Sequence, residues 1–230
     1  MSENSVSVVL AHGAWADGSS WRKVIEGLQA KGVTTIAAPL PLTSLADDVR
    51  SLDRAAERVD GPVVLVGHAY AGAVIGSCRN ERVKSLIYVA GLAPAAGETV
   101  ADVFYRTAPH PQAPKLAPDS HGLIWLPSYA FATAFAQNAT REEHAWLSAV
   151  QRPISPACIG VAVERPLWQN RPSWYLVAEQ DRMIAPATQR FMADRMKARV
   201  RSHPVDHTPI VTAPAGVVEL ILESVHEKAE

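Results

Sequence analysis

The sequence is poor in cysteine and has no excess of charge of either sign. Its 2 cysteines, Cys78 and Cys158, are not spaced as Cys-x-x-Cys and are too few for a disulfide framework. Lysine and arginine number 22 against 23 aspartates and glutamates, without long runs of either sign. This balance argues against a nucleic-acid groove or binding to an anionic membrane. From the two cysteines we expect buried thiols in a reducing cytoplasm. From the balanced charge we expect a small neutral molecule as the partner.

Long hydrophobic runs are also missing. No run reaches the roughly 18 apolar residues that span a membrane, and residues 1–6 contain neither a basic segment nor a long apolar one. We expect a soluble, unprocessed protein. Because 48% of the 230 residues are hydrophobic, the chain can bury one large core, and we expect a single domain over residues 1–230.

Short apolar segments rich in β-branched residues alternate with helical patterns, which predicts a parallel sheet covered by helices on both faces. The helix expected to begin after Ser44 has Asp47 and Asp48 in its first turn, where capping and the helix dipole favour them. The predicted strands are residues 6–11, 33–37, 63–66, 85–89, 173–177 and 200–204. The predicted helices are residues 20–31, 45–59, 71–80, 186–197 and 214–227.

Residues 98–166 interrupt this alternation. The segment is rich in aromatic residues and proline, and has helical patterns near residues 129–137, 141–150 and 156–163. It is too long for a structureless loop in a compact domain, so we expect a folded insertion. A helical cap over an active site is the favoured interpretation, and a packing layer without substrate contact is the alternative.

The most informative segment is residues 63–72, Val-Val-Leu-Val-Gly-His-Ala-Tyr-Ala-Gly. An apolar strand followed by small residues and a helix is typical of the Gly-x-Ser-x-Gly nucleophile elbow, in which a sharp turn presents one side chain above the sheet. Gly67, Ala71 and Gly72 are the small residues of this pattern, and Ala69 stands where the serine would be.

The other parts of a serine hydrolase site have candidates. His207 follows the last predicted strand and is the candidate base, and Asp181 follows the preceding strand and is the candidate acid. The order nucleophile, acid, histidine is that of α/β-hydrolases. His203 and Glu179 are the alternatives: His203 falls within a strand by alternation and is expected to be structural. The alternative to a catalytic role for Asp181 is a structural one, a salt bridge with Arg182 or Arg190.

The first predicted strand ends in His12-Gly13-Ala14-Trp15. A His-Gly step there turns the chain so that the next amide faces the elbow, which makes the N–H groups of Ala14 and Tyr70 the candidate oxyanion donors. Trp15 is a candidate pocket residue, whereas Trp21 is expected in the core. The remaining isolated histidines are not spaced like a metal site, so no metal is expected.

Four stretches, residues 12–21, 67–72, 178–182 and 206–207, resemble the α/β-hydrolase superfamily, in particular its small capped esterase branch related to plant methylesterases and hydroxynitrile lyases. The resemblance implies an α/β-hydrolase fold with an eight-stranded type of sheet, a serine at position 69, an acid at Asp181, a base at His207 and no cofactor. The sequence departs from the family at Ala69 and, mildly, at Ala71. No lysine like that of the lyases lies beside Asp181, which favours ester hydrolysis.

The missing oxygen at Ala69 has two interpretations. The favoured one is an enzyme inactivated by a serine-to-alanine exchange, because alanine removes one oxygen and leaves the remaining machinery in place. The alternative is a natural non-catalytic chain, either a receptor-like ligand-binding protein or a scaffold whose cap mediates protein contacts. Restoring serine separates the hydrolase from the other two.

The expected substrate is a small hydrophobic carboxylic ester or lactone, or an activated amide, since all three use the same triad. Trp125, in the apolar run 123–126, is the preferred cap contact, with core packing as its alternative. Phe131 and Phe135 lie four residues apart on one predicted helical face and are expected to be structural. The other aromatic candidates of the cap are Phe104, Tyr105, Tyr129 and Trp146.

Overall fold

A single parallel sheet forms the centre of the protein. The structure, a computed structural model, describes residues 5–227, so part of the N-terminal segment for which we expected no targeting signal lies outside it. The sheet order is β2-β1-β3-β4-β5-β6, and every pairing is parallel. The strands are β1 (Ser7–Ala11), β2 (Thr34–Ala38), β3 (Val63–His68), β4 (Val83–Val89), β5 (Ser173–Ala178) and β6 (Arg199–His203).

The six predicted strands and the predicted parallel sheet are confirmed. The central strands β1, β3 and β5 are buried along their whole length, as parallel strands covered on both faces must be, which is why their sequences are apolar runs. The edge strands β2 and β6 are more exposed. The eight-stranded sheet implied by the resemblance is wrong for residues 5–227, where the sheet has six strands.

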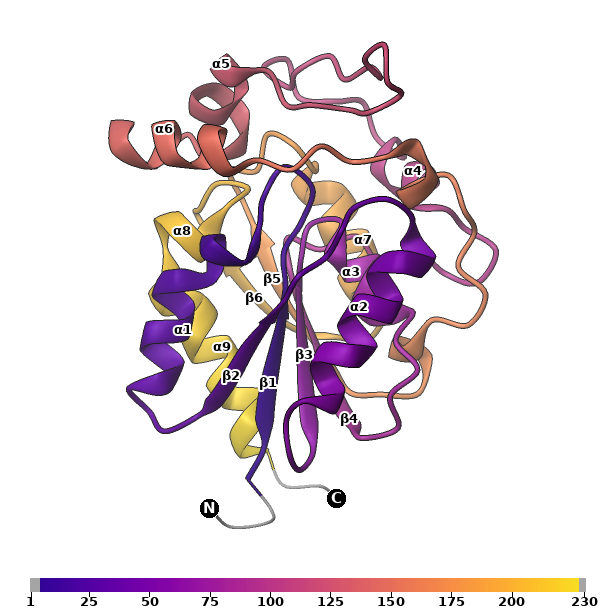
Figure 1. Cartoon of the computed structure of the whole chain (residues 1–230), viewed down its shortest axis with the longest axis vertical. Coiled ribbons are helices and arrows are strands. Elements are labelled where there is room, and N and C mark those ends of the chain that lie inside the picture. Colours follow the sequence, from indigo (N-terminus) through magenta and orange to yellow (C-terminus); the bar gives the residue numbers. More distant parts are fainter. Residues whose placement is uncertain (1–4, 228–230) are drawn as a thin grey trace.

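Helices cover both faces of the sheet (Figure 1). Right-handed crossovers place a helix on one face when the chain moves one way along the sheet and on the other face when it moves back. One layer contains α1 (Arg22–Gln29), α8 (Pro209–Thr212) and α9 (Pro214–His226), and the other contains α2 (Leu45–Glu57), α3 (Ala71–Gly76) and α7 (Pro186–Arg195). Ser44 caps α2 through the amide of Asp47, as expected, and each of the five predicted helices contains an observed one.

The segment 98–166 lies across the carboxyl ends of the strands, at the top of Figure 1, and we call it the cap. Its elements are α4 (Val100–Phe104), α5 (Ser128–Ala130), a π-helical turn η2 (Phe131–Phe135), α6 (Arg141–Val150) and a 3₁₀ turn η3 (Pro156–Cys158), and the turn η4 (Leu167–Gln169) follows it. The helix predicted over residues 156–163 is wrong beyond Cys158. The amide of Val163 donates to the carbonyl of Glu98, and its carbonyl accepts from the amide of Gly97. These peptide groups are therefore not available for helical hydrogen bonds.

Hydrogen bonds at several points join the cap to the sheet-side loops. The amide of Trp15 donates to the carbonyl of Arg152 at 3.1 Å, and its indole N–H donates to the carbonyl of Ile124 at 3.0 Å. The amide of Asn138 donates to the buried Asp206 carboxylate at 2.9 Å. The amide of Ser155 donates to the carbonyl of Leu42 at 3.0 Å, so the cap is fixed at several separate points.

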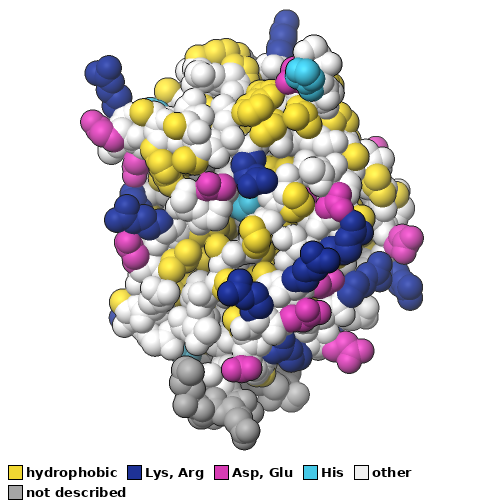
Figure 2. Space-filling view, viewed as in Figure 1, with side chains coloured by type: hydrophobic (Ala, Val, Ile, Leu, Met, Phe, Trp, Pro, Cys, Tyr) yellow, Lys and Arg dark blue, Asp and Glu magenta, His cyan; other side chains and the backbone are white. Residues whose placement is uncertain are grey.

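The surface carries charges of both signs without a continuous field of one sign on the face seen in Figure 2. Cys78 and Cys158 are buried free thiols, as predicted. Within the described part of the chain, no helix combines the length and the apolar character that crossing a membrane requires.

Candidate active site

The turn between β3 and α3 has the geometry of a nucleophile elbow. Ala69 has a φ of 50°, in the left-handed region that a non-glycine residue rarely adopts. Its amide donates to the carbonyl of Val89 at 3.2 Å, and its carbonyl accepts from the amide of Leu92 at 2.9 Å. Hydrogen bonds from the neighbouring strand segment therefore hold the turn in this conformation, with the Ala69 methyl group in the wall of a cavity.

Glycine is required on both sides of the elbow because backbones approach closely there. A Cβ atom at Gly67 would lie 2.6 Å from the carbonyl oxygen of Ala71, and one at Gly72 would lie 2.5 Å from the carbonyl oxygen of Leu92. Ala71 itself is fully buried at the start of α3 without disturbing the helix. The small residues of the motif thus have a packing reason that does not depend on the side chain at position 69.

His207 and Asp181 form a buried hydrogen-bonded pair. His207 Nδ1 donates to Asp181 Oδ2 at 2.8 Å, and the two side chains are 2% and 0% exposed. Asp181 follows β5 and His207 follows β6, so adjacent parallel strands bring together residues 26 positions apart. The His207 ring also lines the cavity that holds Ala69.

The Asp181 carboxylate is fixed by further donors. Its Oδ1 accepts from the amides of Met183 and Ile184 at 2.7 and 2.8 Å, and its Oδ2 also accepts from Gln189 Nε2 at 2.8 Å. Sequence reasoning missed Gln189. A polar residue eight positions after Asp181 in α7 has no motif, and its complete burial is visible only in the structure.

The two alternatives to the pair lie elsewhere. Glu179 forms a salt bridge with Arg190 at 2.6 Å. His203 ends β6, within a strand as expected. Its imidazole lies near Gly216 and is not part of the cavity wall. Of the four candidates, Asp181 and His207 are therefore the two that pair with each other, and His207 lines the cavity.

Two neutral histidines lie beneath the site. Burial lowers the pKa of His68 to about 3 and that of His12 to about 4. His68 Nε2 donates to the carbonyl of His207 at 2.7 Å, and the two rings are 4.9 Å apart. His68 therefore supports the His207 loop as an uncharged donor.

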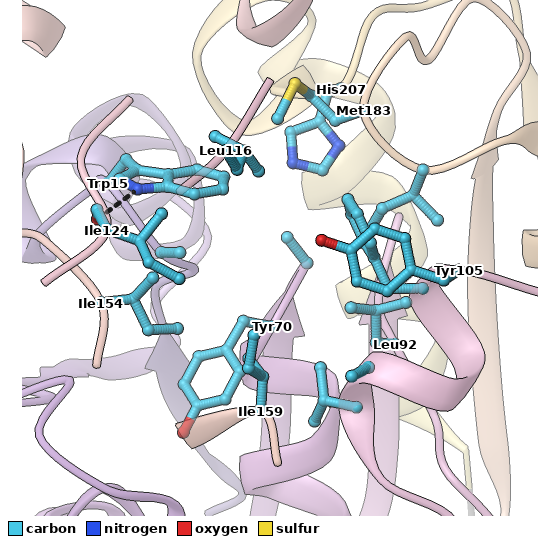
Figure 3. Close-up of a pocket in the computed structure, with 16 residues that line it drawn as sticks. Trp15, Tyr70, Leu92, Tyr105, Leu116, Ile124, Ile154, Ile159, Met183 and His207 are labelled. Carbon is cyan, nitrogen blue, oxygen red and sulfur yellow. Dashed lines mark hydrogen bonds between the residues drawn. The ribbon is translucent and has the colours of Figure 1, made fainter. Parts of the chain in front are cut away.

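The cavity encloses empty space of about 670 Å³, part of it open to solvent, between the elbow and the cap (Figure 3). His207 borders it at one side, Trp15 at another, and the ring of Tyr70 lies opposite His207. None of the described residues in its wall is Lys, Arg, Asp or Glu. The other lining residues are Ala14, Ala69, Leu92, Val100, Ala101, Phe104, Tyr105, Leu116, Ile124, Ile154, Ile159, Met183 and Ile184.

Ala14 and Tyr70 both border this cavity next to Ala69. Neither amide donates a hydrogen bond to another residue within 5–227. Trp15, with a φ of 58°, also lines the cavity and is held by its two bonds to the cap. The assignment of Ala14 and Tyr70 as oxyanion donors and of Trp15 as a pocket residue remains a prediction.

The prediction that Trp125 contacts the substrate needs correction. Its side chain is 45% exposed and its indole N–H donates to Asp119 Oδ2 at 3.0 Å, outside the cavity wall. The preceding residue, Ile124, exchanges backbone hydrogen bonds with Ile154 and lines the cavity instead. Successive side chains of extended backbone point to opposite sides, so when Ile124 faces inward Trp125 faces solvent.

Phe131 and Phe135 are buried, in agreement with the structural function expected of them. Their rings are 5.4 Å apart, and the Phe135 ring also lies 5.3 Å from His207 and 6.3 Å from Trp15. Phe135 thus covers the imidazole from the cap side. Trp21, predicted in the core, is fully buried.

The parallel sheet, the elbow and the buried histidine–carboxylate pair define an α/β-hydrolase. The chain belongs to the alpha/beta hydrolase family, whose model matches residues 8–220. A comparison with curated proteins gave no match. Within the described chain, no group of three or more His, Cys, Asp or Glu side chains is arranged to hold a metal ion.

Three solved structures illustrate the likeness. A pyrethroid hydrolase has 22% identity, a TM-score of 0.83, and coverage of 98% of this chain and 100% of that one. Polyneuridine aldehyde esterase has 17% identity, a TM-score of 0.83, and coverage of 96% and 99%. A methylesterase from Arabidopsis has 15% identity, a TM-score of 0.76, and coverage of 96% and 98%. At these identities the likeness establishes the fold.

Proposed function

We propose that this chain carries the site of a carboxylic ester hydrolase of the Ser-Asp-His type, inactive toward esters because Ala69 stands at the nucleophile position. The observation that supports the proposal is the His207–Asp181 pair, 2.8 Å apart, beside a cavity whose wall includes the strained Ala69. A strained turn with a buried, oriented imidazole is the arrangement that activates a serine hydroxyl.

With serine at position 69, each part has a defined task. The hydroxyl oxygen attacks the acyl carbon while His207 Nε2 takes its proton, and Asp181 holds the imidazole and balances its charge. The amides of Ala14 and Tyr70 donate to the oxyanion. His207 then protonates the leaving alcohol, and water repeats the sequence to release the acid.

The cavity wall favours a neutral, apolar substrate. Its described residues offer no cation for a carboxylate and no anion for an amine, and most are aliphatic or aromatic. We propose a small hydrophobic ester or lactone, with an activated amide as a further member of the class. The names pyrethroid hydrolase and methylesterase, carried by two similar structures, support a hydrolase of this kind.

The decisive experiment is Ala69→Ser, assayed on a size series of p-nitrophenyl esters. We expect kcat/KM to rise by about 1,000-fold or more over the chain as written, because a missing triad residue costs several orders of magnitude. A fluorophosphonate probe should label the variant stoichiometrically and leave the Ala69 chain unlabelled, which excludes a contaminating esterase. In the variant background, His207→Ala should abolish turnover, Asp181→Asn should lower it and His203→Ala should leave it nearly unchanged.

Ala69 also supports a second candidate, a receptor-like protein that binds a neutral ester without turnover. Calorimetry with the chain as written measures that binding. Ligand binding without any gain of turnover or labelling in Ala69→Ser would favour the receptor over the hydrolase.

A further inference from the structure

The chain as written has a base and two candidate oxyanion donors but no nucleophile. Because His207 Nδ1 donates to Asp181, its Nε2 carries the lone pair in this tautomer. No partner for Nε2 is found within residues 5–227, and the ring faces the cavity (Figure 3). In the absence of a hydroxyl at position 69, this nitrogen can take a proton only from a bound molecule or from water.

The amides of Ala14 and Tyr70 can stabilise negative charge on an oxygen by hydrogen bonding, whatever reaction produces the charge. Addition of a nucleophile to a carbonyl produces it, and so does loss of a proton from the adjacent carbon, which gives an enolate. In its covalent form, the first route needs the side chain that Ala69 lacks. The second needs only a base and oxyanion donors on one cavity, which the chain has.

We infer that this site catalyses proton transfer at the α-carbon of a neutral, apolar carbonyl compound, with His207 as the base and the Ala14 and Tyr70 amides as donors to the enolate oxygen. The α-C–H bond breaks as an N–H bond forms at Nε2. The C–H electron pair becomes the C=C bond, and the carbonyl π pair moves to oxygen. Proton return to the same carbon regenerates the carbonyl, so no other reactant is consumed.

Two features of the cavity favour this chemistry. The imidazolium formed at His207 lies against the Asp181 carboxylate, which four donors hold in place and which compensates the new charge without rearrangement. The wall around the enolate is apolar, so the two amide hydrogen bonds act in a medium of low polarity. The Ala69 methyl group offers Nε2 no competing hydrogen bond.

The chemical class follows from the cavity and the base. A neutral benzyl ketone has no charge to pair, presents an aromatic ring to an apolar wall and carries an α-C–H acidified by both the ring and the carbonyl. 1-Phenylpropan-2-one is a suitable probe, because exchange of its benzylic hydrogens in D₂O is followed directly by proton NMR.

The test uses the intact chain. Exchange should saturate with ketone concentration, and His207→Gln should lower the protein-dependent rate by about 100-fold, the usual contribution of a general base. Asp181→Asn should lower it as well, which provides a second variant if His207→Gln fails to fold. His203→Gln, a matched change outside the cavity, should keep the rate. An exchange rate no higher than that of buffer, or one that His207→Gln and Asp181→Asn leave unchanged, overturns the inference.

Ala69→Ser separates this inference from the proposed function. The new hydroxyl takes the hydrogen bond of Nε2 and part of the space for the α-carbon, so exchange should fall by about tenfold or more while ester hydrolysis rises. A gain of ester hydrolysis together with no His207-dependent exchange in the chain as written refutes the inference alone. Exchange without a gain of hydrolysis refutes the proposed function alone.

Discussion

The phenol oxygen of Tyr70 donates a hydrogen bond to Asp48 Oδ2 at 2.6 Å, and both side chains are buried. Asp48 also accepts from the amide of Leu42 at 2.7 Å and lies 3.7 Å from the Cys158 thiol. The hydroxyl of Tyr70 points away from His207 (Figure 3). Asp48 therefore joins the elbow to α2 and to the cap while the Tyr70 ring forms the cavity wall.

Tyr70→Phe should destabilise the protein by about 2 kcal/mol at pH 7, because it removes one donor from a buried carboxylate. Burial already raises the pKa of Asp48, and the Tyr70 hydrogen bond opposes that rise. A raised folded-state pKa means that stability falls as pH increases through it, so the variant's deficit should shrink at pH 4.5. Urea unfolding at both pH values measures the deficit.

Tyr175→Phe is the matched control. The Tyr175 hydroxyl is also buried but donates to a neutral acceptor, the carbonyl of Gly91, at 2.6 Å. Its loss should cost about 1 kcal/mol. If both variants lose the same free energy of unfolding at both pH values, the charge on Asp48 does not contribute to the effect of Tyr70→Phe.

Pattern alone predicted the sheet and the pair His207–Asp181 because both depend on chain order. An apolar run is buried wherever a parallel strand forms, and a loop after a strand reaches the carboxyl edge of the sheet. Gln189 escaped prediction because its partners, Asp181, Ala178 and Ile184, meet it only through the packing of α7 on β5. Such long-range polar contacts leave no periodicity in a sequence.

Gln189→Leu should lower stability by about 2–3 kcal/mol, since the Ala178 amide loses its acceptor and the Asp181 carboxylate loses a donor. In the Ala69→Ser background, it should also reduce kcat more than it changes KM, because Asp181 orients His207. Thermal melting and steady-state kinetics measure the two effects. Arg190→Gln, one residue along, breaks only the half-exposed pair with Glu179 and should change stability by less than about 0.5 kcal/mol.

Stability should fall as pH decreases from 7 to 5. The folded protein keeps His68 and His12 neutral, with pKa values of about 3 and about 4, whereas the unfolded chain protonates them near the ordinary value of 6.5. Because the unfolded state then binds more protons, each histidine should destabilise the fold by about 2 kcal/mol at pH 5 relative to pH 7.

The His68→Gln variant isolates one of these contributions, since glutamine keeps a donor for the His207 carbonyl and does not titrate. Its loss of stability between pH 7 and 5 should be smaller by about 2 kcal/mol. In the unmodified protein, the NMR signal of the His68 ring should not move over this range. A ring that titrates in the folded state near pH 6 contradicts the assignment.

The cap was the least predictable part because its contacts join distant segments. The apolar run 123–126 gave no sign of which side chain faces inward, and the inward direction of Ile124 is set by its hydrogen bonds with Ile154 and Trp15. Backbone pairing thus determines that Ile124 faces the cavity, whereas the sequence favoured the larger Trp125.

Ile124→Ala and Trp125→Ala form a matched pair for this difference. Ile124 is 8% exposed and lines the cavity, so its truncation should raise kcat/KM of the Ala69→Ser enzyme for bulky esters relative to small ones, by about 10-fold. Trp125 is 45% exposed, and its truncation should leave the ratio unchanged while removing only the bond to Asp119. The ratio is measured on butyrate and 2-phenylacetate esters, with thermal melting to confirm that both variants fold. A shift of the ratio in Trp125→Ala and not in Ile124→Ala would mean that the tryptophan faces the substrate in solution.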